Sequence, residues 1–229
     1  MSCALALAVQ GKQGYSAAMI ELYLAAFATF FVLINPAGVA VTFASLTAGY
    51  AQGQRVSVAV RAVIIAGIVL FSFAFLGQWL LQQLGVTLDA FRIAGGVLLF
   101  LIAIDMLFER RQARREETVS KVAEARASGQ MDDISVFPLA IPLITGPGAI
   151  ATMLLFFNEH TATPERAAIL GAAGATLLLT LGLLLATGPL IRVMGATVLM
   201  VMTRIFGIML AALAAQFVVD GVQGAFGLG

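Results

Sequence analysis

Two short segments that combine proline, glycine and a polar side chain within apolar sequence are the first candidates for chemistry. They are Asn35-Pro36-Ala37-Gly38 and Thr145-Gly146-Pro147-Gly148. Because proline lacks an N–H and its ring opposes the carbonyl four residues back, we expect each segment to interrupt a helix. An interrupted helix presents free N–H groups that attract an anion such as a carboxylate, and free carbonyls that can hold a cation. The candidate substrate-binding residues are therefore Asn35, Pro36, Gly38, Thr145, Gly146, Pro147 and Gly148.

The alternative is that both prolines only kink helices and shape their packing, since proline and glycine are common in membrane helices. Two interruptions, each with glycine beside proline, favour a binding site over two unrelated kinks.

Two arginines in apolar surroundings extend the candidate site. Arg204 lies within the apolar stretch 193–219, where a charged group usually faces the protein interior or a cavity and has a partner. Arg92 opens another apolar stretch and has the alternative of reaching back to the membrane interface. We add Arg92 and Arg204 to the substrate-binding candidates. They would bind anionic groups or close gates. The alternative is that each arginine caps loop carbonyl groups and fixes its helix. Asp105 has two interpretations. It binds a proton or a cation, or its carboxylate only reaches to the membrane interface.

The remaining polar residues argue against an enzyme. His160 is the single histidine, so neither a zinc site nor a Ser-His-Asp arrangement is expected. No glycine-rich phosphate loop that ends in Lys-Ser/Thr is present, and the two carboxyl groups of Asp132-Asp133 are adjacent rather than deep in the membrane. We expect no catalytic residue, no metal and no cofactor; a membrane enzyme that uses Asp105 or Asp132 is the remote alternative.

The elements that must position these residues are membrane helices. The chain is 61% hydrophobic and 11% charged, with a mean hydropathy of +1.00, whereas soluble domains average about 25% charged residues. Its apolar stretches reach the roughly 20 residues that cross a bilayer, where backbone groups need internal partners. We expect one all-α polytopic domain over residues 1–229, with Met1–Gln10 as a tail outside the first span. The six expected spans are Ala17–Ala48, Val56–Leu76, Phe91–Phe108, Val136–Phe157, Ala167–Thr187 and Thr203–Val219.

An internal repeat relates the two interrupted helices, which are the first and fourth spans. An offset of 111 residues lays one interrupted segment over the other, and the same offset or one more aligns Arg55 with Arg166 and Arg92 with Arg204. Each half, over residues 17–108 and 134–221, holds three spans, so the halves must have opposite orientations in the membrane. Such inverted repeats are typical of secondary transporters, with the substrate near the bilayer midplane.

The connection over residues 109–133 sets the orientation of the chain. It carries more arginine and lysine than the connections on the other side, which have little beyond Lys12 and Arg166. The positive-inside rule therefore places it in the cytoplasm, with both termini on the periplasmic side. The basic residues between the third and fourth spans are Arg110, Arg111, Arg114, Arg115, Lys121 and Arg126.

Four stretches of the chain resemble the MarC family of bacterial inner-membrane proteins. They are residues 33–38, 91–107, 138–150 and 204–221. The resemblance covers most of the chain and implies six spans and a relation to the six-helix neutral amino acid transporters. Thr145 stands where the family often has alanine, and Ala37 and Val39 stand where bulkier apolar residues are usual, which bears on the size of the substrate.

These features predict a secondary transporter of a small neutral or zwitterionic solute, such as a neutral amino acid, in the bacterial inner membrane. The expected partners are the solute, the lipid bilayer and a coupling Na+ or H+, without nucleic acid, and a homo-oligomer is compatible with the sequence. The alternative is a non-transporting inner-membrane scaffold or assembly protein, in which the interruptions are packing kinks.

Overall fold

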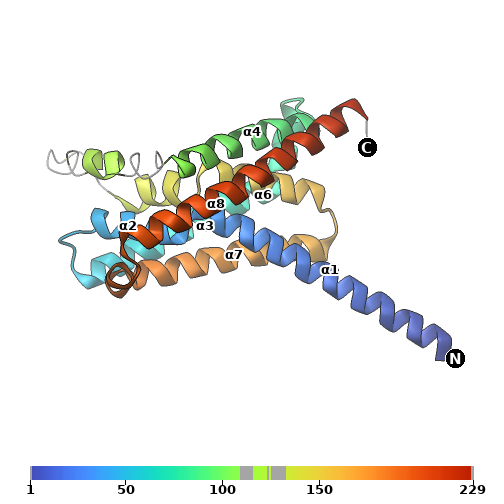
Figure 1. The fold of residues 1–229 in the computed structure, drawn as a ribbon, viewed down its shortest axis with the longest axis horizontal. Helices are drawn as coiled ribbons and strands as arrows, with labels where there is room; N and C mark the ends of the chain where they lie inside the picture. The colour runs from blue at the N-terminus through green and yellow to red at the C-terminus, as the bar shows by residue number, and fades with distance from the viewer. Residues whose placement is uncertain (1, 109–115, 123, 125–132, 228–229) are drawn as a thin grey trace.

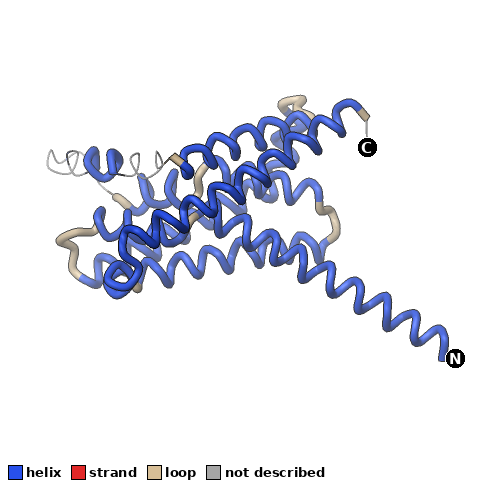
Figure 2. The backbone as a smooth tube through the Cα atoms, in the orientation of Figure 1, coloured by secondary structure: helices blue, strands red, loops and turns tan. Residues whose placement is uncertain are grey.

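The computed structural model describes residues 2–108, 116–122, 124 and 133–227, with the backbone alone for residues 2–14, 188–197, 199 and 200. The basic residues Arg110, Arg111, Arg114, Arg115 and Arg126, and also Asp132, lie outside the described residues. The described part is helical and contains no strand (Figure 2). Its elements are α1 (Ser2–Ile34), α2 (Pro36–Leu46), α3 (Gln52–Gln83), α4 (Leu88–Leu107), η1 (Ser135–Ile144), α6 (Pro147–Glu159), α7 (Thr163–Leu185) and α8 (Thr187–Phe226).

Five described segments are long and apolar enough to cross a membrane. They are residues 15–46, 52–83, 88–107, 163–185 and 201–226, and the first of them runs across Asn35. A sixth span results if η1 and α6, which are bent by 57° at their junction, are counted as one. The chain is therefore an all-α, multi-pass membrane protein, as its composition predicted.

The first helix starts earlier than expected. The segment Met1–Gln10 was predicted to be a tail outside the first span, and the first candidate span begins at Tyr15. The helix α1 itself begins at Ser2, and its first part extends away from the bundle (Figure 1). The sequence 2–14 contains no proline, and its two glycines, Gly11 and Gly14, lower the helix propensity without ending the helix.

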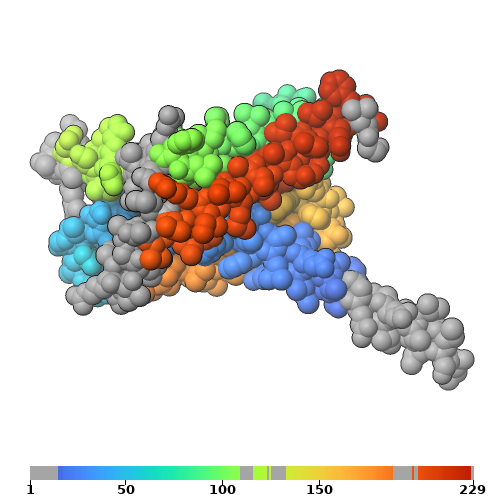
Figure 3. All heavy atoms as spheres, in the orientation of Figure 1, coloured from blue at the N-terminus to red at the C-terminus, as the bar shows by residue number. Residues whose placement is uncertain are grey.

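Helices α4 and α8 form the most extensive pair and lie side by side over most of their length (Figures 1 and 3). Glycines allow this close approach: a Cβ on Gly96 would lie 2.8 Å from the Ala214 carbonyl oxygen, and one on Gly207 would lie 3.2 Å from that of Ala103. Because Gly96 faces the later part of α8 and Gly207 faces the later part of α4, the two helices are antiparallel. Small residues at helix contacts are the usual means of tight packing in membranes.

The other contacts surround α7 and α3. Helix α7 packs against α1, α2 and α3, while α3 packs against η1 and α6. The centre of the bundle is filled by fully buried apolar side chains, the largest of which include Phe30, Phe43, Leu70, Leu99 and Leu155.

Segment η1 is irregular because two prolines interrupt it. The backbone at Phe137 and Ile141 is extended, and Pro138 and Pro142 follow these residues. Its wide turns are closed by hydrogen bonds that span five residues, such as the 2.9 Å bond from the Thr145 N–H to the Ala140 carbonyl. At its start, Asp133 accepts hydrogen bonds from the Ser135 hydroxyl (2.6 Å) and N–H (2.9 Å). These bonds hold the pKa of Asp133 below its usual value, which favours an ionised carboxylate at the start of η1.

Candidate functional site

Asn35 separates α1 from α2. Its backbone is left-handed (φ 52°), a conformation that residues other than glycine rarely adopt, and its side chain is buried. Its Oδ1 atom accepts a hydrogen bond from the Gly38 N–H at 3.1 Å, and Pro36 is the first residue of α2. The amide of Asn35 is therefore used to cap α2, and the N terminus of this helix is closed by its own cap.

The second interruption has a different polar arrangement. Thr145 is buried and its hydroxyl donates to the Ala66 carbonyl oxygen of α3 at 3.0 Å, which joins the end of η1 to the neighbouring helix. Gly146 precedes α6 and has no side chain to cap it, while Pro147 takes the first helical position. The first helical hydrogen bond of α6 is the one from the Ile150 N–H to the Gly146 carbonyl. The N terminus of α6 thus carries no side-chain cap, unlike that of α2.

We expect Thr145→Val to destabilise the protein by about 1–2 kcal/mol, because it leaves the Ala66 carbonyl without its donor at nearly the same side-chain volume. Unfolding in detergent by circular dichroism measures the change. The matched control is Thr42→Val, whose hydroxyl donates within its own helix to Gly38; an equal loss in both variants would contradict a special role for the link between η1 and α3.

A cavity of about 290 Å³ opens at the N terminus of α6. Gly146, Pro147 and Gly148 line one side of it, which brings together three residues that the sequence singled out. The other lining residues are Leu33 of α1, Ile102 and Asp105 of α4, Thr118, Pro142 and Leu143 of η1, and Ala149. Leu33 lies two residues before Asn35, so the side chains next to both interruptions contribute to this cavity.

Asp105 gives the cavity its charge. It is half-buried in the last turn of α4 and faces the same space as the N terminus of α6. A carboxylate and a helix N terminus offer negative and partial positive charge to one bound molecule. Such a pair is suited to hold an ammonium group and a carboxylate together.

A larger hollow of about 590 Å³ lies between α3 and α7. Its lining is apolar apart from Ser72, and includes the exposed side chains of Ile68 and Leu178. It offers no charge to a polar solute, and we place the candidate site at α6 instead.

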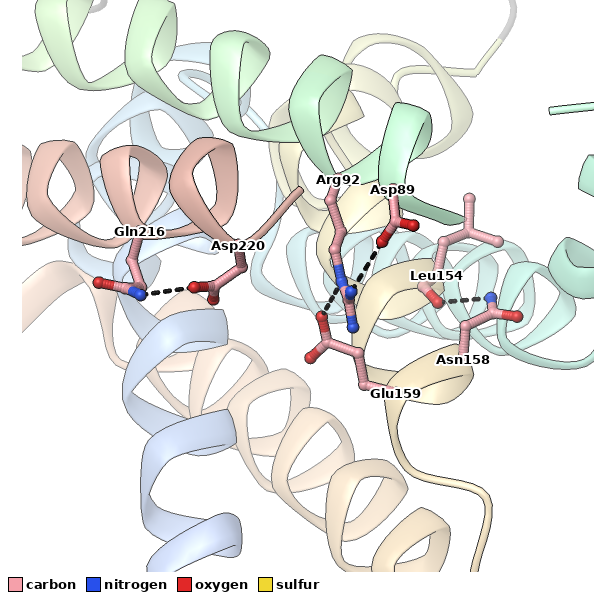
Figure 4. Close-up of polar contacts among 7 residues, drawn as sticks. All are labelled: Asp89, Arg92, Leu154, Asn158, Glu159, Gln216 and Asp220. Carbon is pink, nitrogen blue, oxygen red and sulfur yellow. Dashed lines mark hydrogen bonds and ion pairs between the residues drawn. The ribbon is translucent and has the colours of Figure 1, made fainter. Parts of the chain in front are cut away.

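Arg92 does not line the cavity but belongs to a polar cluster at the opposite end of α4 (Figure 4). Its guanidinium lies 2.8 Å from Glu159 Oε1 at the end of α6 and 3.0 Å from Asp89 Oδ1 on its own helix. The side chains of Arg92 and Glu159 are each 22% exposed. The sequence did not single out Glu159, although an acidic residue that ends an apolar helix is a visible partner for an intramembrane arginine.

Arg204 lies near the other end of the antiparallel α4–α8 pair and its side chain is exposed. It precedes Gly207, which packs against Met106 and Leu107 in the last turn of α4, whereas Arg92 lies in the first turns of that helix. The structure therefore does not bring the two arginines together, and neither lines the cavity.

Comparison with known proteins identifies the family. Residues 20–226 match the family described as MarC family integral membrane protein. The chain belongs to the MarC family. This MarC-family protein is 34% identical over 206 residues to the UPF0056 membrane protein MJ1677 of Methanocaldococcus jannaschii, covering 90% of this chain and 98% of the relative.

Bacterial relatives match over similar lengths. The UPF0056 membrane protein YhcE of Escherichia coli is 34% identical over 209 residues (90% of this chain and 94% of the relative). The UPF0056 membrane protein YvbG of Bacillus subtilis is 30% identical over 210 residues (91% and 97%). No solved structure matches this MarC-family chain, and the names of these relatives state a membrane protein without an activity.

Proposed function

We propose that the protein is a secondary transporter of a small zwitterionic or neutral solute, such as a neutral amino acid, and not an enzyme. The observation that carries the proposal is the cavity in which Asp105 faces the uncapped N terminus of α6. The ammonium group of an amino acid would bind near Asp105, and its carboxylate near the N–H groups of Gly148 and Ala149. The cavity of about 290 Å³ is at the lower end of the range for small-molecule sites, which suits a small solute.

The proposal includes an inverted repeat of the two halves, because such repeats build alternating-access transporters. Helices α2 and α6 begin at Pro36 and Pro147, and α3 and α7 begin at Gln52 and Thr163, so the 111-residue offset applies to both pairs. Contacts recur in the same way: α3 packs on η1 and α6, and α7 packs on their counterparts α1 and α2.

The antiparallel pair α4–α8 favours an inverted rather than a parallel repeat. The 112-residue offset that aligns Arg92 with Arg204 relates α4 to α8. Applied to the contact between Gly96 and Ala214, it predicts an equivalent contact one residue away, at each end, from the one observed between Ala103 and Gly207. An approximate twofold axis between the two helices would exchange these contacts. A parallel repeat would not exchange the contacts of two antiparallel helices in this way.

The arginine pair Arg55 and Arg166 also has matching roles. Arg55 donates through Nε and a terminal nitrogen to the Thr47 carbonyl oxygen at 3.3 and 3.2 Å, at the end of α2. Arg166 donates to the carbonyl oxygens of His160 (3.0 Å) and Phe157 (3.2 Å), at the end of α6. Each arginine thus binds the negative end of the helix that follows an interruption, which is expected of equivalent positions in two repeats.

The proposed topology places the chain in the bacterial inner membrane, with both termini periplasmic and residues 109–133 cytoplasmic. The arginine and lysine residues gathered in that connection support this orientation, because the rule counts Lys and Arg rather than net charge. Since Asp105 lies in the last turn before the connection, the cavity would then be on the cytoplasmic side. A coupling Na+ or H+ is part of the proposal and would be tested by imposed ion gradients.

A thermal-shift comparison of matched solutes tests the binding chemistry. Alanine carries both charged groups, whereas propionate and ethylamine each carry one. A ligand that binds only the folded state stabilises it, by about 2.7 kcal/mol at a hundredfold excess over its Kd. We expect alanine or a similar amino acid to raise the melting temperature more than either single-charge analogue. A screen in which no amino acid or other small solute shifts the melting temperature, while a protein partner co-purifies, would favour the scaffold function instead.

A further inference from the structure

The interface between α4 and α6 runs from the cavity to the Arg92 cluster. At the cavity end, a Cβ on Gly148 would lie 2.7 Å from Ile102 Cδ1 and 3.2 Å from Leu99 Cδ2. In the middle, a Cβ on Gly95 would lie 3.2 Å from Leu155 Cδ1. The two helices are antiparallel, because later residues of α6 meet earlier residues of α4. They are closely packed, because a glycine faces a bulky side chain at both levels.

One polar group is buried within this bundle without a partner. Thr152 lies one turn after Gly148 on α6 and is fully buried, and its hydroxyl makes no hydrogen bond in the described part of the chain. Residues four apart share a helix face, so Thr152 lies on the same face of α6 as Gly148. Gly148 is the one of the two that lines the cavity.

The unpaired hydroxyl of Thr152 contrasts with the other buried threonines of the helices. Five of them donate to the carbonyl oxygen four residues earlier, at 2.7–3.0 Å: Thr29, Thr42, Thr47, Thr176 and Thr180. A buried polar group without a partner costs free energy, and such exceptions in native structures need an explanation such as a water or a ligand. The unpaired hydroxyl of Thr152 thus indicates that a water or a polar ligand binds between the cavity and the Arg92 cluster.

The ion pair of Arg92 and Glu159 closes the far end of the same interface (Figure 4). Helix α8 holds Arg92 from the other side, because a Cβ on Gly221 would lie 3.0 Å from the Arg92 Cβ. The Arg92–Glu159 pair is a salt bridge that joins α4 to α6.

We propose that the α4–α6 interface is the closed half of the solute pathway, that the Arg92–Glu159 ion pair is its gate, and that the Thr152 hydroxyl binds the solute or its water on the way. This inference rests on the proposed transport function. In the described conformation the pathway is open to the cavity beside Asp105 and closed at Arg92. Opening requires the two side chains, each 22% exposed, to separate and become hydrated.

Thiol labelling tests the gate without any solute. Cys3 is the single cysteine, so Cys3→Ser provides the background for Thr152→Cys, which is labelled by a membrane-impermeant maleimide in liposomes. We expect slow labelling with the ion pair intact, and labelling about tenfold faster when Arg92→Gln or Glu159→Gln shifts the population toward the open state. The exchange Arg92→Glu with Glu159→Arg should restore slow labelling.

The matched control is Asp89→Asn, which removes a partner of Arg92 on the same helix and leaves the link between helices in place. The gate is contradicted if Asp89→Asn and Glu159→Gln accelerate labelling equally. It is also contradicted if neither Arg92→Gln nor Glu159→Gln changes the labelling rate of the folded protein. Labelling that responds as expected in a protein that transports no solute would retain the gate and reject the transport function, so the two failures are distinguishable.

The substitution Thr152→Val separates a functional hydroxyl from a structural one. Valine keeps the shape and removes an unpaired polar group, so we expect a higher melting temperature together with uptake reduced by about fivefold or more. A higher melting temperature with unchanged uptake would overturn the role of Thr152, and Thr152→Ser should retain uptake.

Discussion

Replacing Gly148 with leucine is expected to reduce uptake of labelled solute to the level of protein-free liposomes. A Cβ at this position would lie 2.7 Å from Ile102 Cδ1 and 3.2 Å from Leu33 Cδ2. A whole leucine side chain must therefore displace these residues or occupy the cavity. Either outcome removes the space in front of the α6 N terminus, where we place the carboxylate of the solute. The alanine variant should lose part of the activity, because its single methyl group meets side chains that can shift.

The control for Gly148→Leu is Gly182→Leu. Gly182 is exposed on α7, and a Cβ there would meet nothing within 4 Å. Overpacking in a closed site costs about 1–3 kcal/mol, so size-exclusion profiles and melting temperatures must show that both variants fold. Uptake that is equal in the folded Gly148→Leu and Gly182→Leu proteins would reject the cavity as the solute site.

Replacing Asn35 with leucine is expected to lower the free energy of unfolding by about 2–4 kcal/mol and to abolish uptake. The left-handed backbone costs a residue with a Cβ about 1–2 kcal/mol, and loss of the cap costs about 0.5–2 kcal/mol. Leucine also places a larger side chain at a buried position where α1 meets α2.

The variant Asn35→Gly separates the two contributions to this loss. Glycine adopts the left-handed conformation without steric cost, and this gain offsets most of the lost cap to Gly38, so the net change should be a few tenths of a kcal/mol. Denaturant titration in mixed micelles measures both variants. Equal stability of Asn35→Leu and Asn35→Gly would show that the conformation at Asn35 carries no strain.

The membrane helices could be predicted because apolar composition and length decide them. The sequence could also mark Pro36 and Pro147 as positions where a helix begins, because proline cannot donate the helical hydrogen bond and is accepted in the first turn. It could not predict that Asn35 would bind its own helix through Gly38, because a polar side chain next to a break can serve the backbone or a ligand, and only the conformation decides between them.

Contacts between distant segments were beyond the sequence. The hydrogen bond from Thr145 to the Ala66 carbonyl joins residues 79 apart, and the ion pair of Arg92 with Glu159 joins residues 67 apart. Both depend on how the helices pack. The cavity residues Asp105 and Thr118 were likewise not predicted to face Gly146, because no local pattern specifies which helix ends meet.

The most direct measurement of the central claim is solute counterflow in liposomes. Purified protein is reconstituted into liposomes loaded with unlabelled alanine or another amino acid that raised the melting temperature, and trace labelled solute is added outside. A transporter exchanges the two, so label should accumulate transiently in liposomes with the wild-type and Gly182→Leu proteins and not with Gly148→Leu. Absence of label accumulation with the folded wild-type protein, for every solute that binds, would contradict transport through this cavity.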